Sequence, residues 1–348
     1  MYNEKIDIKS LSKEEIEEEL LLMGEPRFRG TQLFKWLSQG IRSFEQMTNL
    51  PKRLIQQLSE KFFIDSLTLD KKQVSKTDGT IKYLWKLKDG NAVETVLMRY
   101  KYGNTVCISS QVGCRQGCVF CASTIGGLIR NLSPAEMLNE VLYTELDSGY
   151  KISNIVLMGI GEPLDNFDNV IKFLSLVNDS DGMNIGMRHI SLSTCGLAEN
   201  VDKLAESNLQ LTLSVSLHAP DNETRTKLMP VNRVCDIDSL LCSCEDYYKK
   251  TGRRISFEYA MIDKINDSDE QAKLLAKHAS KIGAHINLIP LNYVKERDLK
   301  PSSSARIKRF YSILEENKAN VTIRRRLGSD IDASCGQLRK KAAEGREL

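Results

Sequence analysis

The sequence lacks long apolar stretches, since no run in its 348 residues approaches the ~18 residues that a membrane-spanning helix needs. Residues 1–19 are acidic and contain lysines, so they lack the basic patch and apolar run of a signal peptide. Hydrophobic residues (41%) and charged residues (27%) are at the levels of ordinary globular proteins. We therefore expect a soluble, cytoplasmic protein with a large core and no membrane partner.

A strong charge excess is also missing, because 49 basic and 46 acidic residues leave a net charge of +3. The basic residues are nevertheless unevenly placed, with three arginines at 324–326 and a second basic run at 339–341. Such runs either pair with phosphates or form a solvated tail. The charge pattern alone leaves both interpretations open.

A disulfide framework is not expected, because the chain has nine cysteines, an odd number, and no secretory signal. The four histidines, at positions 189, 218, 278 and 285, are scattered. Each cysteine is therefore a metal ligand, a redox-active group or a packing residue.

Residues 1–65 are predicted to form a small helical accessory domain. Ser12 and Glu15 form a capping box before an apolar run, and Pro51 is placed to open a later helix. A further helix is expected around residues 31–38. Residues 66–105 have β character, with Asp-Gly turns that flank 81–87 and precede 93–100, and they are predicted to form a β-hairpin linker region.

From residue 106 to 348, apolar runs alternate with amphipathic segments such as the helix opened by Ser133 and Pro134. This alternation predicts an α/β fold with a parallel sheet, namely a partial (β/α)6 barrel whose functional residues lie at the C-terminal ends of the strands. The expected strands are residues 106–110, 154–158, 189–193, 211–217, 255–261, 287–291 and 321–323.

Three cysteines with CxxxCxxC spacing, Cys114, Cys118 and Cys121, follow directly after the first expected barrel strand. Three thiolates can hold a [4Fe–4S] cluster and leave one iron without a protein ligand. That iron can bind S-adenosylmethionine (SAM) and pass an electron into its sulfonium, which yields a 5′-deoxyadenosyl radical. Phe120 would shield the cluster. A structural zinc site is the competing hypothesis, but no fourth cysteine or histidine lies nearby in sequence.

Two further cysteines have unusual surroundings. Cys335 lies in a polar, glycine-flanked segment, and Cys107 lies within the strand that leads to the three-cysteine loop. By itself each is better explained as a buried packing cysteine, a common role of this residue. Cys195, Cys235, Cys242 and Cys244 are expected to be structural.

With these motifs in order, the chain resembles the RlmN-type radical SAM methyltransferases of the RlmN/Cfr family, which methylate adenosine in RNA. The resemblance covers nearly the whole chain, from the N-terminal GEPRFR at residues 24–29 onward. Its landmarks are VETV at 93–96, SSQVGC at 109–114, MGIGEPL at 158–164, STCG at 193–196, SLHAP at 216–220, NLIPLN at 287–292 and IDASCGQL at 331–338.

The resemblance implies roles for individual residues. Cys335 matches the cysteine that accepts a methyl group from one SAM. Cys107 matches the cysteine that is implicated in removing the C2 proton and in closing a disulfide with Cys335. Glu94 matches a proton acceptor; by itself it is an acid in an apolar strand, which is costly unless paired or used. The residues that match SAM-binding positions are Gly161, Glu162, Ser193, Ser216, Leu217, His218 and Asn292.

The resemblance further implies methylation of C2 of adenosine in 23S rRNA and in tRNA, an electron donor such as flavodoxin or ferredoxin, and a monomer. Cys195 and Ile160 depart from the commoner Ser and Met at their positions. Val112 and Pro163 are the residues expected of a C2 enzyme, where the C8-methylating Cfr-type resistance enzymes carry Cys and Ala. Two hypotheses from different classes compete with this one: a radical activase of a protein substrate, and an RNA-binding protein with a structural metal.

Overall fold

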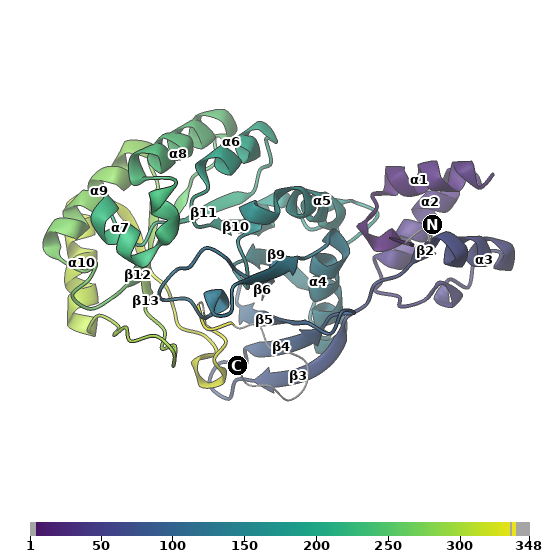
Figure 1. Ribbon diagram of the computed structural model, residues 1–348, viewed down its shortest axis with the longest axis horizontal. Coiled ribbons are helices and arrows are strands. Elements are labelled where there is room, and N and C mark those ends of the chain that lie inside the picture. Colours follow the sequence, from purple (N-terminus) through teal and green to yellow (C-terminus); the bar gives the residue numbers. More distant parts are fainter. Residues whose placement is uncertain (1–4, 335, 339–348) are drawn as a thin grey trace.

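The computed structural model describes residues 5–334 and 336–338. An N-terminal helical unit lies at one end of the molecule, and a large sheet with helices along its outer side forms the rest (Figure 1). Cys335 and the basic run at 339–341 lie outside the described residues.

The N-terminal unit consists of three short helices and a small parallel pair of strands. The predicted capping box is confirmed, because the Ser12 hydroxyl accepts from the Glu15 N–H while the Glu15 carboxylate accepts from the Ser12 N–H. The second helix begins at Phe28, three residues before the predicted start. The elements are β1 (Ile6–Asp7), α1 (Lys13–Leu22), α2 (Phe28–Leu37), α3 (Lys52–Lys61) and β2 (Phe62–Phe63), with 3-10 turns at Ile8–Ser10 and Phe44–Gln46.

A buried lysine joins this unit to the rest of the molecule. Lys9 is 2% exposed, and its Nζ donates to the Asn139 side chain at 2.9 Å and to the Tyr143 hydroxyl at 3.2 Å. Burial lowers the pKa of Lys9 to about 8, although the nearby carboxylates of Asp7 and Asp65 act in the opposite direction. The N-terminal unit is therefore packed against the helix that carries Asn139 and Tyr143, which is α4 (Pro134–Ser148).

The central sheet has ten strands in the described residues, in the order β14-β13-β12-β11-β10-β9-β6-β5-β4-β3. All pairings from β6 to β14 are parallel, and those from β3 to β6 are antiparallel. The strands are β3 (Thr68–Val74), β4 (Ile81–Lys86), β5 (Ala92–Tyr100), β6 (Gly103–Cys107), β9 (Ile152–Leu157), β10 (Ile190–Thr194), β11 (Thr212–Ser216), β12 (Ser256–Met261), β13 (His285–Pro290) and β14 (Asn320–Ile323).

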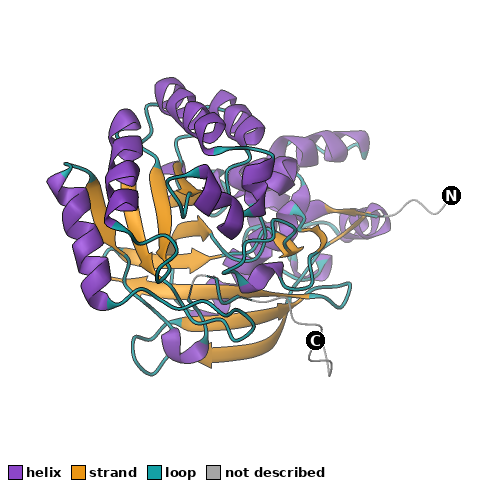
Figure 2. Cartoon of the chain, turned by 60° about the vertical axis from the view of Figure 1, so that its left-hand side comes forward, coloured by secondary structure: helices purple, strands orange, loops and turns teal. Residues whose placement is uncertain are grey.

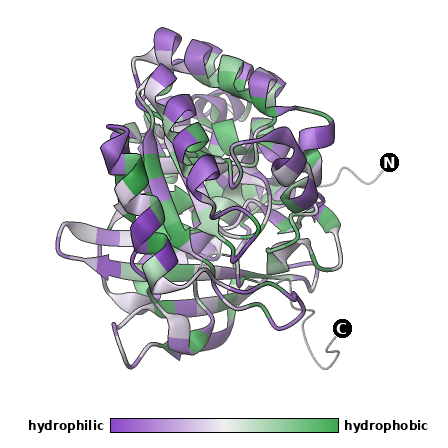
Figure 3. Cartoon of the chain, turned by 90° about the vertical axis from the view of Figure 1, so that its left-hand side faces the viewer, coloured by the Kyte–Doolittle hydropathy of each residue, from purple (hydrophilic) through white to green (hydrophobic). Residues whose placement is uncertain are grey.

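Helices cover the outer side of the parallel strands (Figure 2). Green and purple positions alternate along them, as expected for helices with one face on the sheet and one in solvent (Figure 3). Six strand–helix units precede β14, which confirms the predicted partial barrel; the sheet does not close. The helices are α4 (Pro134–Ser148), α5 (Phe167–Asn178), α6 (Ala198–Glu206), α7 (Asn222–Leu228), α8 (Ile237–Thr251), α9 (Asp269–Ile282) and α10 (Ser304–Glu316).

Residues 66–105 are more than a linker, because β3, β4 and β5 extend the barrel sheet beyond β6. β3 is the edge strand, and six of its seven residues are exposed. The predicted domain boundaries near residues 65 and 105 stay predictions. None of the helices in the described residues is both long and apolar enough to cross a bilayer.

The loop that carries the three cysteines is closed at its base by a short antiparallel pair, β7 (Gln111–Gly113) and β8 (Leu128–Asn131). Gly113 has a φ of 79°, and a Cβ at this position would lie 2.0 Å from the Gly127 carbonyl oxygen. Only glycine therefore permits this closure. Short 3-10 turns follow at Ala122–Thr124, Pro163–Asn166, Met187–His189, Pro230–Arg233 and Ser329–Ile331.

Candidate active site

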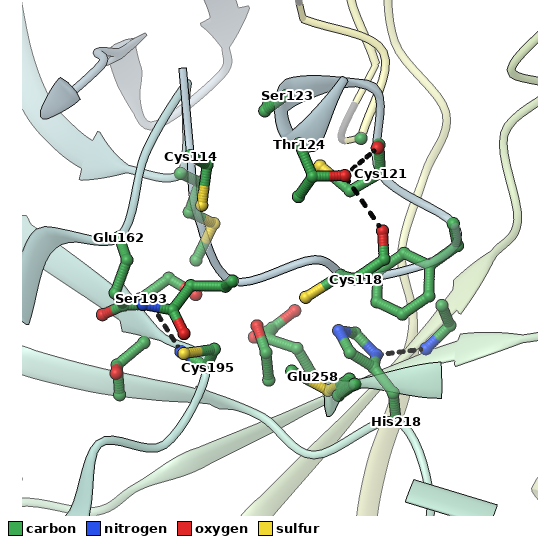
Figure 4. Close-up of a pocket in the computed structure, with 18 of the residues that line it drawn as sticks. Cys114, Cys118, Cys121, Ser123, Thr124, Glu162, Ser193, Cys195, His218 and Glu258 are labelled. Atoms are coloured by element: carbon green, nitrogen blue, oxygen red, sulfur yellow. Dashed lines mark hydrogen bonds between the residues drawn. The ribbon is translucent and has the colours of Figure 1, made fainter. Parts of the chain in front are cut away.

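A cavity of about 160 Å³ lies beneath the cysteine loop, at the C-terminal ends of the barrel strands (Figure 4). Most of the predicted site residues line it, although they come from several separate strands and loops. Among the residues predicted to bind the cluster or SAM, Leu217 alone does not line it, because its side chain is fully buried in the main core. The predicted catalytic residues Glu94 and Cys107 lie outside this cavity. The predicted residues that line the cavity are Cys114, Cys118, Cys121, Gly161, Glu162, Ser193, Ser216, His218 and Asn292.

The three loop cysteines surround this cavity, as Figure 4 shows. Burial raises the pKa of the Cys114 thiol to about 12 and that of Cys118 well above its ordinary value. Within the described residues, no three His, Cys, Asp or Glu side chains converge on one metal-ion position. Three thiols spaced around a shared cavity fit a polynuclear cluster with three protein ligands.

Glu162 is a buried carboxylate at the cavity wall. Its two oxygens accept the N–H groups of Cys195 at 2.7 Å and Leu164 at 3.0 Å, and burial raises its pKa. In the part of the chain that the structure describes, no lysine or arginine forms an ion pair with it. A ligand ammonium group would therefore supply the missing positive charge, which is what the amino group of SAM offers.

The backbone before Glu162 makes a turn that only glycine permits. Gly161 has a φ of 106°, and a Cβ there would lie 2.6 Å from the Cβ of Gln111. The Gln111 side chain in turn accepts from the Glu162 N–H at 2.9 Å. Strand β7 therefore determines where the Glu162 carboxylate lies.

His218 presents a fixed hydrogen-bond donor. Its Nδ1 accepts from the Ala260 N–H at 2.9 Å, and its ring meets Phe120 edge-on at 4.7 Å between centroids. Burial, together with the charge of Arg225, lowers the pKa of His218 to about 3. The ring is thus neutral near pH 7 with its proton on Nε2, the nitrogen that faces the cavity in Figure 4.

Glu258, on β12, also lines the cavity, but the sequence interpretation did not single it out. It is 4% exposed and accepts from the Asn287 amide at 2.7 Å and the Ser256 hydroxyl at 3.1 Å. Arg324 lies 3.7 Å from it, nitrogen to oxygen. An acid within an apolar strand is the signal that drew attention to Glu94, and the same signal would have found Glu258.

Arg324 differs from its two neighbours in the basic run. All three arginines line an adjoining cavity, but of the three only Arg324 also lines the main cavity. Arg324 is half-buried, whereas Arg325 and Arg326 are exposed.

A second, smaller cavity of about 40 Å³ adjoins the first, and Cys107 lines it. The two cavities share Met158, Ile289, Asn292 and Arg324. Ser334 lines the second cavity and Gly336 the first, so one neighbour of position 335 borders each cavity. Because Cys335 lies outside the described residues, its predicted disulfide with Cys107 stays a prediction.

Hydrogen bonds hold this C-terminal segment against the cysteine loop. The Ala122 N–H donates to the Gly336 carbonyl at 2.8 Å, and the Ser123 hydroxyl donates to the Leu338 carbonyl at 2.9 Å. The loop that holds the cluster ligands therefore also positions the segment of the expected methyl-accepting cysteine.

Glu94 is 1% exposed and lies on the same face of β5 as Val96 and Met98, which line the second cavity. Its carboxylate lies 3.0 Å from the ammonium group of Lys82. The buried acid is thus paired, which answers the energetic question that the sequence raised.

Of the basic residues in the N-terminal unit, Arg27, Lys52 and Arg53 are exposed. Lys35 is exposed but lies 3.2 Å from Asp181, and Arg29 is half-buried against its own helix. Fewer of these five basic residues are therefore fully solvated than the sequence suggests.

Comparisons with known proteins agree with this site. Residues 108–276 match the radical SAM superfamily, and residues 6–64 match the ribosomal RNA large subunit methyltransferase N-terminal domain. A probable dual-specificity RNA methyltransferase RlmN of Lachnoclostridium phytofermentans is 51% identical over 338 residues, which cover 97% of this chain and 95% of the relative. The corresponding protein of Clostridioides difficile is 46% identical, over 98% of this chain and 99% of its own length.

A solved structure, that of a radical SAM methyltransferase from Sphaerobacter thermophilus, superposes with a TM-score of 0.90 at 41% identity. The match covers 96% of this chain and 99% of that one. Membership of the radical SAM superfamily implies a [4Fe–4S] cluster and SAM as cofactors. With both of its regions and nearly its whole length matched, the chain belongs to the RlmN family of radical SAM RNA methyltransferases.

Proposed function

We propose that this enzyme methylates C2 of adenosine in 23S rRNA, at the peptidyl transferase centre, and C2 of the adenosine 3′ to the anticodon in tRNA. The observation that supports this most strongly is the adjacency of the two cavities. One is lined by the cluster cysteines and the Glu162 carboxylate, and the other by Cys107. Of the two neighbours of position 335, Gly336 lines the first cavity and Ser334 the second.

When bound, the cluster and SAM supply a 5′-deoxyadenosyl radical and the transferred methyl group. In the proposal, Cys114, Cys118 and Cys121 hold the cluster. Glu162 binds the ammonium group of SAM, and Gly161 lets the backbone approach the ligand closely. His218 donates from Nε2 into the same cavity. Ser193, Ser216 and Asn292 complete the polar wall.

Cys335 carries the methyl group in this scheme, because C2 of adenine is not nucleophilic and direct polar transfer from a sulfonium would fail. Its S-methyl group loses a hydrogen atom, and the resulting carbon joins C2. Cys107 then takes part in removing the C2 proton and closes a disulfide with Cys335, which releases the product. Glu94 is the proposed proton acceptor. A small flavodoxin or ferredoxin is the proposed electron donor, and the enzyme is proposed to act as a monomer.

The alternative product is 8-methyladenosine. Of the two positions that distinguish the enzyme types, Pro163 lines the main cavity, and Val112 is fully buried in β7, two residues before Cys114. Because this chain carries the residues of the C2 type at both, we favour C2.

Two cysteine variants test the proposal. Cys335→Ala is expected to assemble the cluster yet transfer no methyl group to RNA. Cys107→Ala is expected to accumulate a denaturation-resistant protein–RNA adduct that is absent from the double variant. Mass spectrometry of nucleosides from treated rRNA and tRNA identifies the product. Normal methylated RNA from either single variant would reject the mechanism, and 8-methyladenosine would reject the proposed position.

A further inference from the structure

Residues 75–82, from the β3–β4 turn into β4, contact the loop that leads to Cys335. The Asp330 carboxylate accepts from the Ser75 hydroxyl at 2.7 Å and from the Lys76 N–H at 2.9 Å. The Asp78 carboxylate accepts from the Gly328 N–H at 2.8 Å. We call residues 75–82 the hairpin clamp, because these bonds attach the C-terminal loop to the hairpin.

Lys82 is the buried end of this clamp. It is 6% exposed, and its ammonium group lies 3.0 Å from the Glu94 carboxylate and donates to the Asp332 carbonyl at 3.0 Å. Asp332 has a φ of 49°, which is uncommon for a residue other than glycine, and it precedes Cys335 by three positions. One side chain therefore contacts both Glu94 and the backbone next to the methyl-accepting segment.

The register of the sheet places Lys82 in line with Cys107. Lys82 is opposite Val96 on β5, and Val96 is opposite Cys107 on β6, so the three side chains share one face of the sheet. With strands about 4.8 Å apart, Lys82 and Cys107 are separated by roughly 10 Å. The same face packs against Ala333 and Leu338.

Stability alone does not explain a buried ion pair here. Such pairs contribute little compared with well-packed apolar side chains, because both charges lose their hydration. We propose that Lys82 is a positioning residue that fixes, through one ammonium group, both the Glu94 carboxylate and the segment carrying Cys335. This inference rests on the proposed function, which assigns roles to Glu94 and Cys335.

Misplacing the methyl-bearing segment would let the radical be quenched without methylating RNA. The test therefore measures two products in the same reaction of the reconstituted enzyme with an RNA fragment: 5′-deoxyadenosine and 2-methyladenosine. We expect Lys82→Met to raise their ratio about tenfold, since small displacements in an active site are costly. Lys82→Arg should give an intermediate ratio. Lys86→Met, on the same strand and face but only partly buried, should keep the wild-type ratio.

Two outcomes overturn the inference: a wild-type ratio in a folded Lys82→Met enzyme, or a parallel fall of both products, which would indicate a purely structural role. If Lys82→Met does not fold, Asp330→Ala decides, because Asp330 is an exposed anchor of the same loop. A raised ratio there supports the clamp, and a wild-type ratio overturns it. Wild-type enzyme that forms 5′-deoxyadenosine but never 2-methyladenosine would instead reject the proposed function.

Discussion

His218 should make the cluster-free protein lose stability in mild acid. Its pKa falls from 6.5 in the unfolded chain to about 3 in the folded protein, because burial disfavours the charged ring. Its contribution to the free energy of unfolding is fully present above pH 6.5 and is lost as the pH falls toward about 3. Each unit of pKa difference corresponds to about 1.4 kcal/mol, so the loss between pH 8 and pH 5 amounts to about 2 kcal/mol.

The substitution His218→Asn isolates this contribution. Asn keeps a side-chain acceptor for the Ala260 N–H and tolerates the positive φ of 55° at this position. The measurement is denaturant unfolding of the reduced, cluster-free protein between pH 5 and pH 8. Relative to the variant, the free energy of unfolding of the wild type should fall by about 2 kcal/mol from pH 8 to pH 5. His189→Asn, at an exposed histidine, should keep the wild-type pH dependence. Parallel pH profiles for wild type and His218→Asn would refute the reasoning.

Three further predictions concern the cofactors and the RNA. Replacing any one of the three loop cysteines with Ala should remove bound iron and abolish 5′-deoxyadenosine formation; product formation by an iron-free variant would contradict the assignment. Gly161→Ala should weaken SAM binding at least about tenfold at unchanged iron content, because its Cβ would lie 2.6 Å from Gln111; unchanged affinity in equilibrium binding would count against the site. Neutralising Arg27, Lys52 and Arg53 together should weaken RNA binding and reduce the slope of log affinity against log salt by about 2, while SAM cleavage persists. An unchanged slope would leave these residues as a solvated face.

Much of the fold could be predicted because its signals are local. The capping box at Ser12 and the helix start at Ser133 depend on residues three positions apart, and both are confirmed. Most barrel strands were visible as apolar runs because their apolar side chains are buried. The edge strand β3 has no such pattern, since most of its side chains face solvent and its pairing with β4 alone makes it a strand.

The candidate site also has parts that the sequence shows directly and parts that it does not. The cysteine loop and the turn at Gly161 are contiguous motifs, so the sequence displays them directly. The partners of Glu258 and Glu94 are distant from them in sequence. Asn287 reaches Glu258 from the neighbouring strand β13, and Arg324 reaches it from the end of β14. Lys82 reaches Glu94 across the hairpin. Only the register of the sheet brings these groups together, and a single sequence does not show that register.

The hairpin clamp also affects when the enzyme becomes complete during synthesis. Lys82 and the Asp332 carbonyl that it contacts are 250 positions apart, so this contact has to wait until the ribosome has made the chain through residue 332. Contacts between distant positions form late because closing a long loop costs entropy before the contact forms. The cysteine loop is made before the segment that carries Cys335, the proposed methyl acceptor. If Cys335 has this role, the proposed methyl transfer has to wait until the ribosome has made this segment and its contact with the hairpin clamp has formed.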